Sequence, residues 1–244
     1  MYDFTLSKAR AGPEALLNDY NGYLHADAAN LYDQLYTRQN MTEVACWAHA
    51  RKFHEAQITA PLQAARAMVL ISKLYRIEKE IKKDLAEQSW ELSVQEASRV
   101  QIRQEKAIPV LKELHDWLHA EAPKLLPKSP IAKAVNYALR HWQALHRYTE
   151  QGYLNIDNNA AERALRVIAL GRKNWLFAGS EQGGRNAAII YSIVQSCLHA
   201  GVEPQAYLTD ILAKLPTWPK DRLSELSPAA WKPQQFDNNN PTPS

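Results

Sequence analysis

The chain has 244 residues, of which 46% are hydrophobic and 23% charged, so it is long and apolar enough to bury a substantial core. This composition excludes a disordered chain and a collagen-like repeat. The 29 basic and 26 acidic residues leave a net charge of only +3, which does not by itself indicate a nucleic-acid partner. Two cysteines are too few for a disulfide framework, and no window approaches about 18 uncharged apolar residues. We therefore expect a cytoplasmic protein that does not span a membrane.

Three short candidate strands lie near the N-terminus. Tyr2–Leu6 alternates and is rich in aromatic and branched residues, which favours a strand almost at the first residue. After Pro13, residues 14–18 are typical of a short helix. A second strand is predicted over Gly22–Ala26, ending at Asp27, and a third over residues 41–47.

The middle of the chain has helical periodicity. Apolar residues three or four apart predict an amphipathic helix over residues 62–89, and a second helix is expected over residues 94–119 with a kink at Pro109. Between Arg76 and Lys106, seven basic residues are mixed with seven acidic ones. Mixed charge of this kind usually marks a solvated helix face.

Capping signals divide the C-terminal half. Ser129 before Pro130 opens one helix, Asn158 is a natural N-cap for another, and Gly201 can end a third. These signals predict helices over residues 130–152, 160–170, 185–200 and 204–215, with a disordered tail over residues 232–244.

Together the elements predict a mostly helical α+β fold, with a small mixed core interrupted by an all-helical insertion. The expected divisions are residues 1–60 for the N-terminal part of the core, 61–128 for the insertion, 129–231 for the C-terminal part, and 232–244 for the tail.

The segment from Ile156 to Arg166 permits two interpretations. In the first it is structural: Asn158 caps the helix, and Glu162 pairs with Arg166 one turn later. In the second, Glu162 is a metal ligand on an early helical turn and meets Asp27, which sits at a predicted strand end. Two such carboxylates are what Mg²⁺ needs, because that ion takes one or two carboxylates together with water and phosphate.

A basic stretch follows from Arg163 to Arg185. Its cations outnumber its single acid, Glu181, by four, so the rest of the chain sums to −1. An ordinary solvated surface would explain such a cluster, but nearby glycines and an aromatic residue also favour binding to a phosphodiester backbone. The candidate DNA-binding residues are Arg163, Arg166, Arg172, Lys173, Asn174, Trp175 and Arg185.

Cys46 and His49 lie three residues apart and could form half of a zinc site, although no second Cys/His pair of suitable spacing occurs. Packing in the core is the alternative for both side chains.

Five blocks of sequence, in order, resemble the insertion sequence 66 family of bacterial transposases. The similarity covers roughly residues 1–231. The blocks are Gly22–Asp27, Cys46–Phe53, Asp157–Asn159 with Ala161–Arg163, Gly171–Trp175, and Gly201-Val202 with Pro204.

The resemblance implies a ribonuclease-H-like fold with an Asp-Asp-Glu metal triad and a helical insertion before the glutamate. By motif position, Asp27 matches the second aspartate and Glu162 the glutamate. The family's first aspartate belongs to an Asp-Glu-Thr block that would precede residue 1, so we expect an incomplete ribonuclease-H-like core.

The resemblance also implies the cofactor and the partners. Mg²⁺ or Mn²⁺ would be the cofactor, bound weakly by this chain alone, and the ends of the mobile element would be the DNA partner. Self-association and contact with a full-length transposase or accessory proteins are further expectations. The function implied is metal-dependent DNA strand cleavage and transfer when the site is complete. The alternative is an inactive DNA-binding or oligomerising remnant that modulates the full-length transposase.

Overall fold

The computed structural model describes residues 1–7, 9–27, 31–38, 40–171 and 178–231. The chain forms two compact units, one comprising Ala9–Arg163 and the other comprising Met1–Lys8 with Ala164–Ser244. The sequence-based domain boundaries, which divide the chain differently, stay a prediction.

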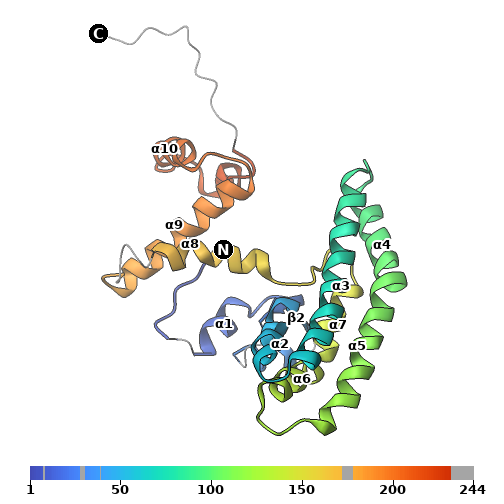
Figure 1. The fold of residues 1–244 in the computed structure, drawn as a ribbon. Helices are drawn as coiled ribbons and strands as arrows, with labels where there is room; N and C mark the ends of the chain where they lie inside the picture. Colours follow the sequence, from blue (N-terminus) through green and yellow to red (C-terminus); the bar gives the residue numbers. More distant parts are fainter. Residues whose placement is uncertain (8, 28–30, 39, 172–177, 232–244) are drawn as a thin grey trace. The chain divides into compact units, whose positions relative to one another are not determined.

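The larger unit contains a two-stranded sheet and most of the helices (Figure 1). Its strands are β1 (Gly22–Ala26) and β2 (Met41–Ala45). Its helices are α1 (Ala11–Leu16), α2 (Lys52–Glu55), α3 (Pro61–Ala86), α4 (Leu92–Ile102), α5 (Ile108–Glu121), α6 (Pro130–Arg140), α7 (Trp142–His146) and the first turn of α8 (Asn159–Gly171).

The two strands run parallel, with Gly22 opposite Met41 and Ala26 opposite Ala45. The second and third predicted strands are thus confirmed, although β2 ends two residues earlier than expected. Val44 and Ala45 are fully buried, so β2 supplies much of the apolar contact between the sheet and the helices.

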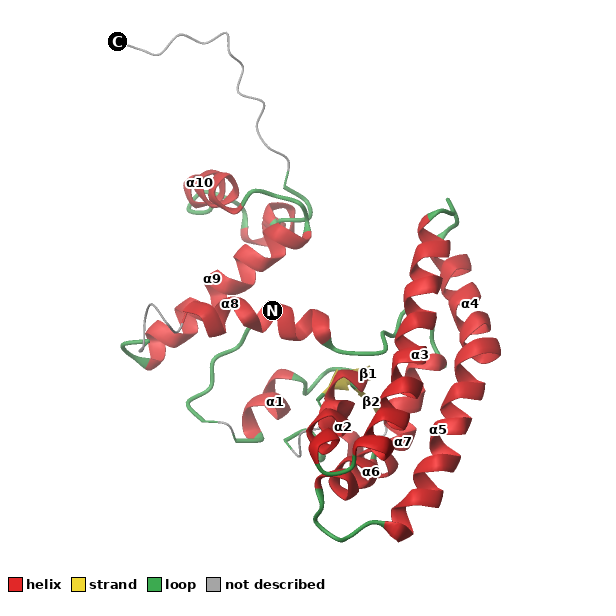
Figure 2. Cartoon of the chain, in the orientation of Figure 1, coloured by secondary structure: helices red, strands yellow, loops and turns green. Residues whose placement is uncertain are grey.

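The long helices of this unit pack side by side. α3 runs alongside α4 and α5, and α6 packs on α2 and α5 (Figure 2). Along α3, the buried residues recur every three or four positions from Ala64 to Leu85, as in an amphipathic helix. Leu62 and Val69, which the periodicity assigned to the apolar stripe, are instead exposed.

The predicted interruption near Pro109 takes the form of a π-helical turn. It spans Arg103–Ala107 and joins α4 to α5. Proline lacks an N–H and its ring crowds the carbonyl four residues earlier, which favours a widened turn at this point. This turn directs Arg103 into the protein interior.

Arg103 is fully buried and uses every N–H donor of its guanidinium. Nε and Nη2 donate to the Glu78 carboxylate at 2.8 and 2.7 Å, forming a bidentate pair. Nη1 donates to the carbonyls of Tyr148 and Gln151, and Nη2 donates to that of Leu154, at 2.6 to 2.9 Å. The buried charge therefore holds the loop that precedes α8 against α3 and α4.

Gly152 lets this same loop approach α4 closely. A Cβ at this position would lie 2.2 Å from the backbone oxygen of Glu96. Arg99 donates to the carbonyl of Gly152 at 2.8 Å, so the loop is fixed at two neighbouring points.

In the second unit, α9 (Glu181–His199) and α10 (Pro204–Lys214) pack around Cys197, Tyr207 and Ile211. As predicted, Gly201 follows the end of α9 and has a positive φ of 69°.

The predicted first strand, Tyr2–Leu6, is wrong. This segment is irregular and follows the helices of its unit: the Tyr2 N–H donates to Ser192 Oγ at 2.7 Å, and the Tyr2 hydroxyl donates to the Ala164 carbonyl at 2.6 Å. No strand within the described residues of this unit is present to pair with it. Side-chain contacts therefore override its β-propensity.

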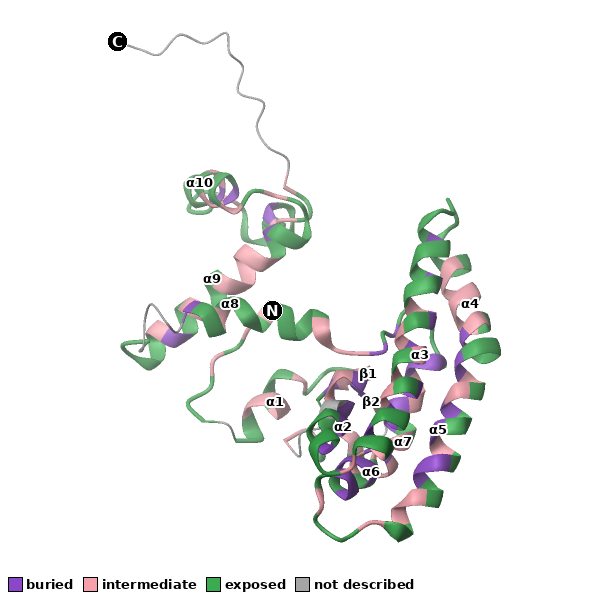
Figure 3. Cartoon of the chain, viewed as in Figure 1, coloured by how far each residue is buried: buried purple, intermediate pink, exposed green. Residues whose placement is uncertain are grey.

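Burial is uneven along the chain (Figure 3). Buried residues gather where α3, α5 and α6 face one another, whereas α8 is exposed along most of its length. The mostly helical α+β class is confirmed. No helix in the described part of the chain is long and apolar enough to cross a membrane.

Removing the Arg103 side chain should strongly destabilise the larger unit. We expect Arg103→Met to lower the free energy of unfolding by about 3–5 kcal/mol, because it leaves the Glu78 carboxylate and several carbonyls without their partner. Urea denaturation followed by circular dichroism measures the loss. The matched control, Arg76→Met, removes an exposed arginine that faces Glu80 on α3 and should cost less than about 1 kcal/mol. Equal losses in the two variants would contradict the anchoring role of Arg103.

Candidate active site

The carboxyl ends of the two parallel strands define the edge where the candidate residues gather. Ala26 and Ala45 form the last registered pair, and Asp27 and Cys46 follow them directly. In open α/β sheets this edge is the usual position of a binding site. Asp27 and Cys46 are thus the first residues beyond the paired part of the two strands.

The start of α8 is hydrogen-bonded to the end of β2. The Trp47 N–H donates to the Ile156 carbonyl at 3.1 Å, and the Asn158 N–H donates to Cys46 Sγ at 3.3 Å across 112 positions of sequence. The Trp47 indole donates to the Leu145 carbonyl at 2.8 Å. These bonds bring the early turn of α8, which carries Glu162, to the strand edge.

Glu162 meets His49 and Cys46 at this edge. His49 Nε2 lies 3.5 Å from Glu162 Oε1, with the two side chains 34% and 45% exposed. One ligand atom from each of Cys46, His49 and Glu162 lies within 4.8 Å of the other two. Sequence reasoning separated these residues: it paired Glu162 with Asp27 and left Cys46 and His49 as half of a site.

Neighbouring groups shape the electrostatics of the edge. Burial raises the pKa of the Cys46 thiol, while the N–H groups of Asn158, Ala48 and His49 act in the opposite direction. Burial, followed by the influence of Cys46 and Asp27, raises the pKa of Tyr137 to about 12. Cys46 and Asp27 therefore both act on the same phenol of α6.

Asn158 does not cap α8 through its side chain. Its Oδ1 is buried and accepts no hydrogen bond from the described residues. Asp157 takes over part of that role, since its carboxylate accepts from the Asn159 backbone N–H at 3.2 Å and from Asn159 Nδ2 at 2.7 Å.

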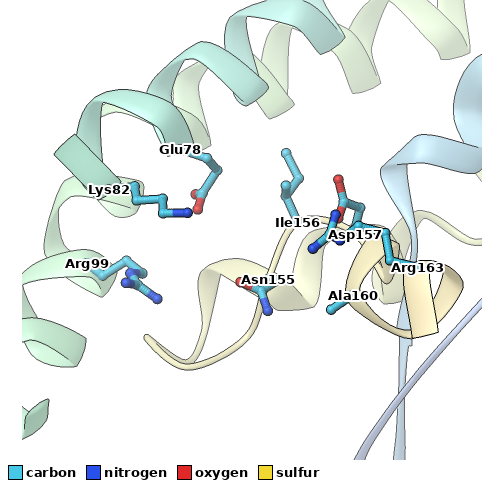
Figure 4. Close-up of a pocket in the computed structure, with 8 residues that line it drawn as sticks. All are labelled: Glu78, Lys82, Arg99, Asn155, Ile156, Asp157, Ala160 and Arg163. Atoms are coloured by element: carbon cyan, nitrogen blue, oxygen red, sulfur yellow. The ribbon is translucent and has the colours of Figure 1, made fainter. Parts of the chain in front are cut away.

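A polar cavity of about 270 Å³ lies beside this segment. Lys82 from α3 and Arg99 from α4 extend toward it, and Arg163 of α8 lies beside Asp157 (Figure 4). The remaining lining residues are Glu78, Asn155, Ile156 and Ala160. The sequence analysis did not identify Lys82 and Arg99 as candidate site residues, because they belong to a run of mixed charge typical of a solvated helix face.

The other candidate DNA-binding residues follow Arg163 in sequence and belong to the second unit. Arg166 is exposed on α8, and Arg185 forms an ion pair with Glu181 at 2.6 Å on α9. Arg172, Lys173, Asn174 and Trp175 lie outside the described residues.

Comparison with known families identifies the chain. Residues 1–186 match the family described as "Transposase IS66 family", and residues 192–229 match the "IS66 C-terminal element". The chain belongs to the IS66 family of transposases. The resemblance seen in the ordered sequence blocks is thereby confirmed.

IS66-family relatives occur in Sinorhizobium fredii (strain NBRC 101917 / NGR234). The chain is 33% identical over 239 residues to the "Uncharacterized protein y4hP", covering 90% of this chain and 41% of that protein. It is 30% identical over 244 residues to the "Uncharacterized protein y4jD", covering 96% and 46%. The chain thus spans less than half the length of these curated relatives. No solved structure matches it.

His25, on β1 beside this edge, should make stability depend on pH. Burial lowers its pKa below the usual 6.5, opposed by a backbone hydrogen bond at Ala45 and by the Asp157 charge. Below pH 6.5 the unfolded chain binds a proton that the folded chain resists, so the free energy of unfolding should fall as the pH drops toward the folded-state pKa. Each unit of difference between the two pKa values contributes about 1.4 kcal/mol.

The variant His25→Gln, which cannot take up this proton, should flatten that dependence in urea denaturation between pH 7.5 and 5. The control His54→Gln removes an exposed imidazole on α2. An identical loss of stability on acidification in wild type and His25→Gln would disprove the assignment.

Proposed function

We propose that the chain supplies two of the metal-binding carboxylates, Asp27 and Glu162, of a DDE-type transposase that cleaves and joins DNA strands. The observation that carries this proposal is the tie between α8 and β2. It delivers Glu162 to the edge of a parallel sheet at which Asp27 follows the neighbouring strand. Membership of a transposase family supports this reaction class.

The donor set fits a hard divalent cation. Asp27 and Glu162 are carboxylates on exposed positions, as Mg²⁺ prefers because it keeps several water ligands. Bound ions would activate a water or a 3′-hydroxyl and stabilise the leaving oxygen at phosphorus. The contribution of the chain is to hold both carboxylates on anchored backbone, one after β1 and one on α8.

The ribonuclease-H-like core belongs to this proposal. Two parallel strands with Asp27 at their carboxyl edge, followed by an all-helical stretch from α3 to α5 and then by the helix bearing Glu162, are consistent with that architecture.

Binding to DNA would be dominated by phosphate contacts. Lys82, Arg99 and Arg163 line one cavity beside Asp157, with Glu78 neutralised by its bidentate pair with Arg103. A backbone phosphate is the ligand that such a set of cations suits, and phosphate contacts supply affinity without sequence specificity.

The chain spans 40 to 46% of its relatives' length. DNA cleavage is therefore proposed for a transposase as long as those relatives that includes this segment. The second candidate is a DNA-binding or oligomerising remnant that modulates the transposase. Exposed aliphatic side chains on α8 and α9 favour it, among them Leu165, Leu170, Ile189 and Ile190.

Replacement of either carboxylate should weaken binding of Mn²⁺, used as a calorimetric probe for Mg²⁺. We expect Asp27→Asn and Glu162→Gln each to reduce Mn²⁺ affinity by about tenfold or more, because each removes a charged oxygen ligand. The control Asp116→Asn removes an exposed acid paired with Lys112 on α5 and should bind as wild type does. In a transposase of family length, Glu162→Gln should abolish cleavage of the element ends.

Unchanged Mn²⁺ affinity in both carboxylate variants would overturn the catalytic proposal. DNA binding by such a chain, without any response to the metal, would favour the remnant instead.

The basic segment should bind duplex DNA through its phosphates. Arg172→Ala combined with Lys173→Ala should weaken binding to unrelated duplexes equally, and should reduce the slope of log K against log salt by at most about 2 units. Fluorescence anisotropy at several salt concentrations measures both quantities. Arg76→Ala with Lys79→Ala removes the same charge from α3 and serves as the control. A slope unchanged by the first pair of substitutions would place those cations away from DNA.

A further inference from the structure

We propose that Cys46, His49 and Glu162 form a binding site for a borderline or soft divalent metal ion such as Zn²⁺. The thiol and the imidazole are no part of the acidic triad that the family resemblance implies, so this site goes beyond the proposed function. Its evidence is the approach of a sulfur, a ring nitrogen and a carboxylate oxygen to within 4.8 Å of one another.

The spacing of Cys46 and His49 follows from one helical turn. Cys46 precedes the 3₁₀ helix Trp47–Arg51, and the His49 N–H donates to the Cys46 carbonyl at 3.2 Å. Because side chains three residues apart eclipse in this conformation, the turn places the sulfur and the imidazole on the same side. The local backbone therefore presents two ligands together.

Glu162 arrives from the far side of the sequence and completes the set. The Trp47 N–H to Ile156 and the Asn158 N–H to Cys46 Sγ fix the start of α8 against this turn. Glu162 is thus positioned by hydrogen bonds to Cys46, which is itself a proposed ligand, and to Trp47 beside it.

The distances suit a tetrahedral ion after a small adjustment. Zinc lies about 2.3 Å from sulfur and about 2.0–2.2 Å from nitrogen or oxygen, which sets ligand atoms about 3.3–3.7 Å apart. His49 Nε2 and Glu162 Oε1 are already 3.5 Å apart. The widest separation in the cluster, at most 4.8 Å, needs a contraction of about 1 Å.

The surroundings leave the ligands available and accessible. Nδ1 of His49 is buried and makes no hydrogen bond within the described part of the chain, so this ring is not committed to holding the fold together. The partly exposed side chains of His49 and Glu162 give an ion a path from solvent, while Cys46 forms the buried floor. Three protein ligands with an open fourth position are the pattern of zinc sites that hold a water or a substrate as the fourth ligand.

The type of ligand decides between metals. Thiolate and imidazole favour Zn²⁺ or Co²⁺, whereas Mg²⁺ prefers oxygen alone. Since Glu162 would serve both sites, occupation by Zn²⁺ would engage the carboxylate that the proposed Mg²⁺ site uses.

Titration of the 244-residue chain with Co²⁺ tests the site by spectroscopy. Wild type should develop a thiolate-to-cobalt charge-transfer band together with the intense visible bands of tetrahedral cobalt, and Zn²⁺ should displace the ion. Cys46→Ser should lose the charge-transfer band. Cys197→Ser, which alters the other cysteine, in the core of the second unit, should retain it.

His49→Gln and Glu162→Gln, both at partly exposed positions, should weaken Co²⁺ binding by about tenfold or more even if Cys46→Ser proves poorly folded. Absence of the band in wild type, its persistence in a folded Cys46→Ser chain, or unchanged affinity in both other variants would overturn the proposal. The Mn²⁺ affinity of Asp27→Asn tests the proposed function separately, because Asp27 is not a ligand of this site.

Discussion

The buried guanidinium of Arg103 is the interaction on which the arrangement of the larger unit depends. It joins the π-helical turn between α4 and α5 to Glu78 on α3 and to three carbonyls of the loop after α7. A buried charge is tolerated only when its hydrogen-bonding capacity is fully used, as here. α3, α4 and the π-helical turn therefore set the path of the loop that leads to α8.

That path has a chemical consequence at the strand edge. Residues 156–158 continue directly from the loop fixed by Arg103 and bond to Cys46 and Trp47 at the end of β2. Glu162, one turn into α8, then meets His49. A carboxylate far from the sheet in sequence thus reaches its edge because of the buried charge of Arg103, which gives α3 and α4 a positioning role in the proposed metal chemistry.

Local signals predicted the elements well. Ser129 accepts a hydrogen bond from the Ala132 N–H, as its position before Pro130 indicated. The strands β1 and β2 were both predicted from short segments of sequence. Tertiary contacts were harder to predict from the sequence. Arg103 looked like one more charge on a solvated face, because burial depends on partners as far away as Leu154. The meeting of Glu162 with Cys46 could not be derived from spacing, since it follows from backbone bonds across more than a hundred positions.

The most direct test of this account is a crystal of the chain soaked in Mn²⁺ and measured for anomalous scattering at the manganese edge. The account predicts a peak at the carboxyl edge of β1 and β2, about 2.0–2.6 Å from a carboxylate oxygen of Asp27 or Glu162, with the other carboxylate within roughly 8 Å of the first. Anomalous peaks found only away from this edge, or the two carboxylates on opposite faces of the unit, would contradict the account.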